Sequence, residues 1–472
     1  MALLPLLTKR LGKSLFLPAH GRGQALPDEF KRLLKQRAGV WDLPELAEIG
    51  GPLEPEGAVG ESQRESAAVM GADHCWYGVN GATGLLQAAL LAIAQPGDAV
   101  LMPRNVHRSL IQACVLGGIK PLLYNIPYLT KQGHSAPPNH AWMKRVLAEL
   151  ANKEWQIKAA VLVHPTYQGY ANDPSDIIAT LHEQGLSVLV DEAHGCHLAA
   201  GIDSGLPPSS LHCGADLVVH SLHKSAAGLA QTAVLWLKGQ RVSPERIERC
   251  LGWIQTTSPS SLLLASCESA IQRVFNTRGR KHLANRIHEG RLLKFRLIQS
   301  GVPLIETQDP LRIVLHTGSA GISGIEADDW FIKHGLIAEL PEPGTLTFCL
   351  GLSKHHDLYS NLTKAWEKLI QANQDRSAQK DFETPPLPLL ATPEVCLSQA
   401  WNAPNRVVTF EQSEGEVASE LACPYPPGIP LLIPGERVDH ARALWLTKQS
   451  QLWSDVLPNE IKVRKIGAPE SG

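Results

Sequence analysis

Residues 215–224 read ADLVVHSLHK, an apolar strand that ends in Ser221-Leu222-His223-Lys224. Upstream, a second apolar strand, Leu186 to Val190, ends in Asp191-Glu192-Ala193-His194-Gly195. In an α/β sheet, successive parallel strands present their carboxyl ends along one edge. The sequence therefore predicts that an acid and a lysine meet at that edge.

This pair indicates a pyridoxal phosphate (PLP) enzyme. Such enzymes bind the cofactor as a Schiff base on a lysine, and an acid keeps the pyridine nitrogen protonated so that the ring accepts electrons. Lys224 is the predicted Schiff-base lysine and Asp191 the predicted partner of the nitrogen. The alternatives are a surface lysine at a strand end and, for Asp191, a helix cap or a DEAH helicase box. The helicase alternative fails because the sequence has no G-x-x-x-x-G-K-[ST] loop.

Four neighbours of this pair are predicted to bind the cofactor. Ala193 is small enough to pack beneath a flat ring, and His194 is placed to reach the ring hydroxyl or Asp191. Ser221 and His223 are expected to donate hydrogen bonds to the cofactor phosphate. His223 adjoins the lysine and is also a candidate proton shuttle.

Two strand-to-helix turns nearer the N-terminus supply further candidates. The turn Asn80-Gly81-Ala82-Thr83-Gly84 opens a helix, where Ala82 and Thr83 let backbone N–H groups and a hydroxyl approach a phosphate. Its alternative is an ordinary capped turn. At the next such turn His107 suits a ring that stacks on the cofactor, and its alternative is a polar surface residue. Arg104 and Arg108 are expected to be solvated or to contact an anion.

The composition of the chain argues against several classes of protein. The 472 residues are 44% hydrophobic with a net charge of −2, which is typical of a globular protein and gives no sign of a nucleic-acid partner. The apolar stretch Leu85 to Ala94 is too short and interrupted for a membrane span. Nine scattered cysteines without a C-x-x-C pair indicate free thiols, and the histidines lack metal-ligand spacing, so we expect a cytoplasmic protein without a metal site.

The pattern of strands and helices divides the chain into five parts. Buried strands without alternation predict a large α/β domain with a mostly parallel sheet, and a polar, proline-rich stretch predicts a linker. The predicted parts are an N-terminal arm (1–40), the PLP-binding large domain (41–295), a small α/β domain (296–372), the linker (373–393) and a C-terminal domain (394–472).

Taken in order, the motifs of this chain resemble the prokaryotic ornithine/lysine/arginine decarboxylase family, PLP enzymes of the aspartate-aminotransferase fold (fold type I). The matching segments run along most of the chain, and the last is characteristic of this family among enzymes of the fold. They are Asn80–Gly84, Arg104–Ser109, His164–Gly169, Asp191–His197, Gly214–Asp216 leading to Ser221–Lys224, Gln231–Ala233, Thr256–Ser260 and Tyr425-Pro426-Pro427-Gly428-Ile429-Pro430. The chain departs from the family pattern at Pro18-Ala19-His20-Gly21-Arg22-Gly23, at Ala82 and at Ser260.

The resemblance implies a PLP-dependent decarboxylase of a basic amino acid, with arginine preferred over lysine and ornithine, in polyamine biosynthesis. Catalysis would fall to Lys224, Asp191, His107 and His223. The chain is similar to the short form of the family, without the N-terminal wing domain, which implies a homodimer or homotetramer. The loop Thr256–Ser258 would then come from the second subunit of a site between protomers. Glu436 is a candidate for the distal group of the substrate, and a solvated glutamate is its alternative.

Two other functions stay open at this point. An aminotransferase or α-oxoamine synthase shares the same lysine and acid, and it needs an arginine for the substrate carboxylate, for which Arg312 is the candidate. A non-catalytic homologue that binds PLP has no chemical need for Lys224, Asp191 and His107 together.

Overall fold

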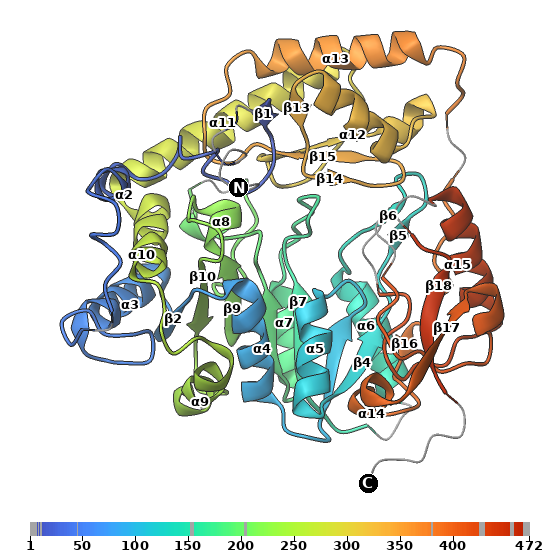
Figure 1. Ribbon diagram of the computed structural model, residues 1–472, viewed down its shortest axis with the longest axis horizontal. Helices are drawn as coiled ribbons and strands as arrows, with labels where there is room; N and C mark the ends of the chain where they lie inside the picture. Colours follow the sequence, from blue (N-terminus) through green and yellow to red (C-terminus); the bar gives the residue numbers. More distant parts are fainter. Residues whose placement is uncertain are drawn as a thin grey trace.

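The computed structural model describes residues 7, 9, 12–44, 46–151, 155–202, 205–378, 381–423, 430–453 and 457–465. At its centre is an eight-stranded sheet of order β16-β4-β3-β7-β8-β9-β10-β2 (Figure 1). Its strands are β2 (His74–Gly78), β3 (Ala99–Pro103), β4 (Lys120–Tyr124), β7 (Ile157–Val163), β8 (Ser187–Asp191), β9 (Leu217–Ser221), β10 (Ala233–Leu237) and β16 (Leu390–Ala391).

Most neighbouring strands of this sheet are parallel. The pairs β4–β3, β3–β7, β7–β8 and β8–β9 are parallel, whereas β10 is antiparallel to β9 and β2, and β16 is antiparallel to β4. The prediction of a mostly parallel α/β sheet is confirmed. Parallel pairing gathers the carboxyl ends of β3, β7, β8 and β9 at one edge, where the loops carry the predicted site.

Helices cover both faces of the sheet, which explains why apolar and polar residues do not alternate along its strands. Val100 packs with the helices of one face and Leu101 with those of the other, and both are fully buried. The first layer comprises α4 (Gly81–Ile93), α5 (Arg108–Gly117) and α9 (Pro244–Ile254). The second comprises α3 (Gly57–Met70), α6 (His140–Ala151), α7 (Ser175–Glu183) and α10 (Ser261–Phe275).

A smaller α/β unit lies beyond the end of the sheet (Figure 1). Its antiparallel sheet runs β11 (Leu304–Ile305), β12 (Arg312–Leu315), β15 (Leu346–Cys349) and β14 (Leu340–Pro341). Its own core includes Leu15, Phe331 and Phe348. Around it lie α11 (Thr277–Gln299), α12 (Gly324–Lys333) and α13 (Leu358–Ala372).

The N-terminal arm is part of this smaller unit. Its strand β1 (Lys13–Ser14) pairs in parallel with β13 (Leu336–Ile337), and Leu15 enters the core. Beyond the strand, the arm passes the predicted site, where the N–H of Ala19 donates to the carbonyl of His223 at 2.8 Å. The arm then forms α2 (Asp28–Leu34).

The C-terminal residues form a third cluster at the β4 side of the sheet (Figure 1). Strands β17 (Asn405–Thr409) and β18 (Glu460–Arg464) pair, and α15 (His440–Leu452) packs on them. The predicted linker ends in β16, so its last residues extend the main sheet. The five-part division of the chain stays a prediction, and residues 425–429 of the C-terminal motif lie outside the described residues.

The remaining elements are short connections: β5 (Tyr128–Leu129), β6 (His134–Ser135), α8 (Leu222–Ser225), α14 (Leu397–Asn402) and three 3₁₀ turns at Leu198–Ala200, Thr317–Ala320 and Glu411–Ser413. In the described part of the chain, no helix has both the length and the apolar character that a membrane crossing requires.

Candidate active site

Lys224 and Asp191 lie at the carboxyl ends of neighbouring parallel strands. Asp191 is the last residue of β8 and is paired in register with Val219 of β9. After β9 ends at Ser221, the chain turns directly into the short helix α8, which carries Lys224. The N–H of Ser221 donates to the carbonyl of Ala193 at 3.3 Å and ties the two strand ends together.

The Asp191 carboxylate is buried, with 7% of the residue exposed. Its Oδ1 accepts a hydrogen bond from the N–H of Ala193 at 3.2 Å. Among the described residues, Asp191 forms no ion pair with lysine, arginine or histidine, although Lys224 follows the adjacent strand. A buried carboxylate is ordinarily paired, so this one is arranged to receive a positive group from elsewhere.

Lys224 contacts a histidine instead of the acid. Its Nζ lies 3.2 Å from Nε2 of His194, and Nδ1 of the same ring lies 3.3 Å from Nη2 of Arg312. Burial lowers the pKa of Lys224, and the charges of Asp191 and Glu339 oppose that change. Burial also lowers the pKa of His194 well below its ordinary value, and the charges of Lys224 and Arg312 add to the effect.

These contacts fix the positions of the protons. Arginine only donates hydrogen bonds, so Nδ1 of His194 must accept from Arg312. A neutral imidazole with an accepting Nδ1 carries its proton on Nε2. That N–H then points at the Lys224 amine, which accepts it only when the amine is neutral. The hydrogen-bond directions therefore favour the nucleophilic form of Lys224.

His223 and Ser221 form a second hydrogen-bonded group beside the lysine. Nδ1 of His223 lies 3.0 Å from Oγ of Ser221 and 3.5 Å from the carbonyl oxygen of Thr232. Burial lowers the pKa of His223 to about 4, and the charge of Lys224 contributes. His223 is therefore neutral at pH 7. Ser221 is fully buried.

The other predicted residues lie at helix starts. His107 is the N-cap of α5, its Nδ1 lies 2.8 Å from Oγ of Ser109, and the residue as a whole is exposed. Ala82 and the exposed Thr83 lie in the first turn of α4, which packs against β8 and β9. Gly81 opens this helix with φ +72°, a conformation that favours glycine.

The sequence prediction missed two residues of this site and misjudged a third. Tyr167, in the loop after β7, lies with its ring centroid 4.3 Å from that of His194 and 5.8 Å from Lys224 Nζ. Its hydroxyl donates to Glu339 of the smaller unit, whose other oxygen accepts from the N–H of Leu17 at 2.8 Å. The sequence did contain a signal for Tyr167, because this residue follows a central strand of the sheet. Glu339 has no sequence signal because the smaller unit brings it in.

The misjudged residue is Arg312, expected only as a carboxylate ligand of an aminotransferase. It is 2% exposed, and besides His194 it contacts the carbonyl of Tyr167 at 3.3 Å and Asp309 at 3.8 Å. Its guanidinium thus binds protein groups behind His194, and it does not present two free N–H groups to a substrate carboxylate.

The two expectations for Glu436 are also wrong. Glu436 is 3% exposed and forms a bidentate ion pair with the fully buried Arg104, with one Nη1–Oε2 distance of 3.0 Å. Its Oε2 also accepts from the N–H of Ile433 at 2.9 Å. Glu436 therefore joins the C-terminal cluster to the end of β3, and it is neither solvated nor free to bind a substrate. Of the two expectations for Arg104, solvation and contact with an anion, the second is the one observed, and the anion is the Glu436 carboxylate.

Comparison with known proteins assigns this chain to a family. The major domain of the Orn/Lys/Arg decarboxylases matches residues 8–314, and the C-terminal domain of the same enzymes matches residues 375–455. The chain belongs to the Orn/Lys/Arg decarboxylase family. It is a PLP-dependent amino-acid decarboxylase.

Individual relatives of this decarboxylase cover most of its length. It is 28% identical to "Arginine decarboxylase" of Bacillus anthracis, over 93% of this chain and 90% of that protein, and 29% identical to "Arginine decarboxylase" of Bacillus subtilis, over 92% and 89%. In structure it is similar to lysine decarboxylase A from Pseudomonas aeruginosa, with a TM-score of 0.76 at 17% identity over 93% of this chain and 76% of that one. These similarities confirm the predicted fold class.

The described residues of the decarboxylase fit its cofactor. A partly buried amine whose hydrogen-bond partner favours its neutral form suits an aldehyde, and a buried carboxylate without an ion pair among the described residues suits a protonated pyridine nitrogen. The start of α4 offers N–H groups and a hydroxyl for a phosphate. Bound there, PLP supplies an electron sink for the bond that breaks at the substrate Cα.

Proposed function

We propose that this decarboxylase converts L-arginine into agmatine and CO₂. The observation that carries the choice of substrate is the extent of the similarity. Relatives named arginine decarboxylase are 27–29% identical, and the match spans 89–94% of each. Relatives named lysine decarboxylase are 22% identical, and the match spans 67–72% of each. Lysine and then ornithine follow as alternative substrates.

Lys224 and Asp191 are proposed to carry the chemistry. Lys224 would hold the cofactor covalently through its amine, whose neutral form the His194 contact favours. Asp191 would hold a proton on the pyridine nitrogen, because its Oδ1 is fixed by the N–H of Ala193 and its carboxylate forms no ion pair among the described residues. The ionised carboxylate stabilises that proton by charge–charge attraction in a buried setting.

The remaining residues are proposed to position the cofactor and move a proton. His107 and Ala193 would contact the two faces of the ring, and His194 would stay hydrogen-bonded beside Lys224. For the phosphate we propose four ligands from two elements, namely Ala82 and Thr83 at the start of α4 and Ser221 and His223 around the start of α8. Lys224 or His223 would return a proton to the substrate carbon.

The contacts of Arg312 with other protein groups support decarboxylation over transamination. An aminotransferase retains the substrate carboxylate and benefits from an arginine that binds it. A decarboxylase must release that carboxylate as CO₂, and a strong ion pair to it would stabilise the ground state. The buried contacts of Arg312 with His194 and Asp309 support its role as a positioning residue for His194.

The decisive experiment measures both products. Purified protein with PLP is given arginine, lysine or ornithine separately, and CO₂ and the amine are quantified. We expect agmatine from arginine in the wild type and none in Lys224→Ala. Cadaverine or putrescine as the main product would transfer the proposal to lysine or ornithine. A cofactor-loaded protein that releases no CO₂ from any of the three would contradict the assignment of a basic amino acid.

We further propose a cytoplasmic homodimer or homotetramer that acts in polyamine biosynthesis, with the Thr256–Ser258 loop completing the site of the partner subunit. This loop follows α9 and is exposed in the single chain, as a segment that reaches a second protomer would be. Sedimentation equilibrium should give two or four times the mass of the chain. A monomer with full activity would contradict the shared site.

A further inference from the structure

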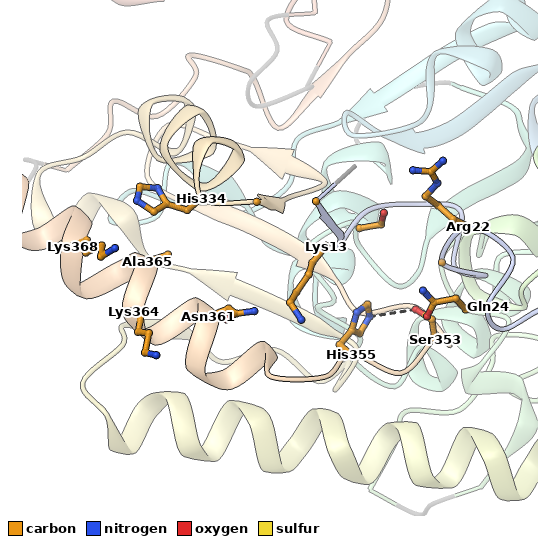
Figure 2. Close-up of a pocket in the computed structure, with 14 residues that line it drawn as sticks. Lys13, Arg22, Gln24, His334, Ser353, His355, Asn361, Lys364, Ala365 and Lys368 are labelled. Carbon is orange, nitrogen blue, oxygen red and sulfur yellow. Dashed lines mark hydrogen bonds between the residues drawn. The ribbon is translucent and has the colours of Figure 1, made fainter. Parts of the chain in front are cut away.

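A basic cavity lies between the N-terminal arm and the smaller α/β unit, outside the active site. It has a volume of about 640 Å³. The arm supplies one wall through β1 and residues 21–24, and helix α13 supplies the opposite wall (Figure 2). A volume of this size accommodates a small-molecule ligand.

The charge of this cavity is strongly one-sided. Two arm residues and two helix residues give four positive charges, two histidine rings also line the cavity, and no aspartate or glutamate occurs among the described residues that line it. Lys364 and Lys368 lie one turn apart on the same face of α13, and neither forms an ion pair within the described part of the chain. The basic residues are Lys13, Arg22, His334, His355, Lys364 and Lys368.

The arm side of the cavity is held in place by close backbone packing. A Cβ on Gly12 would lie 2.4 Å from the carbonyl oxygen of Gly335, so only glycine lets β1 approach β13 there. At Gly21, φ is +54° and a Cβ would lie 2.3 Å from Oγ of Ser353. The cavity is therefore built by the fold, and its charges do not depend on mobile surface chains alone.

The arm cations are anchored by backbone carbonyls. Lys13 donates to the carbonyl of His356, and Arg22, which itself adopts φ +53°, donates to the carbonyls of Lys9 and Leu7 at 2.8 and 3.2 Å. Carbonyl oxygens orient a cation without neutralising it. Within the described part of the chain, the positive charges that face the cavity thus have no ion-pair partner.

We propose that this cavity binds a small polyvalent oxyanion, such as a phosphate ester. Like charges gathered around one hollow repel one another, and an anion with two or more charges removes that repulsion while it accepts their hydrogen bonds. The site is distinct from the cofactor phosphate site, which the start of α4 and the residues around the start of α8 supply. A monovalent carboxylate would gain less from four cations than a phosphate ester gains.

The test uses the PLP-loaded holoenzyme, gel-filtered to remove unbound PLP because free PLP is itself a phosphate ester, and inorganic pyrophosphate as the probe. Isothermal titration should show one saturable site per chain that weakens as chloride is raised. In Lys364→Glu/Lys368→Glu, pyrophosphate affinity should fall roughly tenfold or more. The neutral pair Lys364→Gln/Lys368→Gln should lose less, and it covers the case in which charge reversal disturbs folding.

Lys144→Glu is the matched control, because Lys144 is an exposed lysine on α6 of the large domain. It should bind pyrophosphate within twofold of the wild type. The proposal is overturned if the wild type shows no saturable binding up to about 10 mM, if both α13 double variants bind as the wild type does, or if Lys144→Glu weakens binding as much as they do.

Discussion

Replacing Arg312 by methionine should raise the pKa of Lys224. Arg312 donates to Nδ1 of His194 at 3.3 Å, and Nε2 of the same ring lies 3.2 Å from Lys224 Nζ. Without the guanidinium, Nδ1 is free to carry the proton, and Nε2 becomes an acceptor for a protonated Lys224. The variant also removes a positive charge that disfavours the charged lysine.

The size of the effect follows from the geometry. Two hydrogen bonds and one imidazole ring separate the two cations by roughly 8 Å, which at an effective dielectric constant near 20 corresponds to about 2 kcal/mol of repulsion. That energy is worth about 1.5 pKa units. Because the neutral amine is the reactive form, covalent incorporation of PLP should slow about 30-fold at a pH below both pKa values.

The assay is the rate at which the apoprotein incorporates PLP, followed by absorbance as a function of pH. The midpoint should move to higher pH in Arg312→Met and move less in Arg312→Lys, which keeps the charge. Lys294→Met is the control, because it removes another buried cation that donates to the carbonyl of Asp309 at 2.7 Å and does not touch His194. An Arg312→Met midpoint equal to or below that of the wild type would refute the proton assignment.

Three further variants test other parts of the structure. In Asp191→Asn, PLP should still bind, but kcat should fall roughly 100-fold, because a charge-assisted hydrogen bond to the pyridine nitrogen is worth about 2–3 kcal/mol; steady-state kinetics measure this. In Glu436→Gln, the buried Arg104 loses its counter-charge, so urea unfolding should show a loss of about 3–5 kcal/mol while the KM for arginine stays unchanged. Burial alone would raise the pKa of Asp309, yet the charges of His197 and Arg312 hold it well below its usual range. The stability from Asp309 is thus present above pH about 4 and lost as the pH falls further, and Asp309→Asn should flatten that dependence in urea unfolding.

The parts of the site on the main sheet could be predicted from the sequence. Asp191 ends one buried strand of the sheet, and Lys224 comes just after the next. Because these two strands are parallel, both residues lie at the same edge of the sheet. His107 follows from the same rule at β3. Each of these positions depends only on its own strand and turn.

The parts contributed by other units could not be predicted in this way. Arg312 and Glu339 reach the site because the smaller unit docks there, and no local pattern encodes that packing. Glu436 shows the opposite case, since its place after the C-terminal motif indicated a substrate ligand. Only the fold reveals that the fully buried Arg104 lies beside it and occupies both of its oxygens.

The separation of Asp191 from Lys224 supports the proposal that these two residues bind the cofactor. Opposite charges on neighbouring strand ends would ordinarily pair, and a paired lysine is protonated and unreactive. Here the Ala193 N–H holds the carboxylate while His194 holds the amine, and Arg312 fixes the imidazole so that its proton faces the lysine. Arg312 is itself kept in the interior by Asp309, which also pairs with His197 at 3.1 Å. Asp309 therefore acts on Lys224 through Arg312 and His194, so a mutation at Asp309 should disturb the reactivity of Lys224 although it does not touch it.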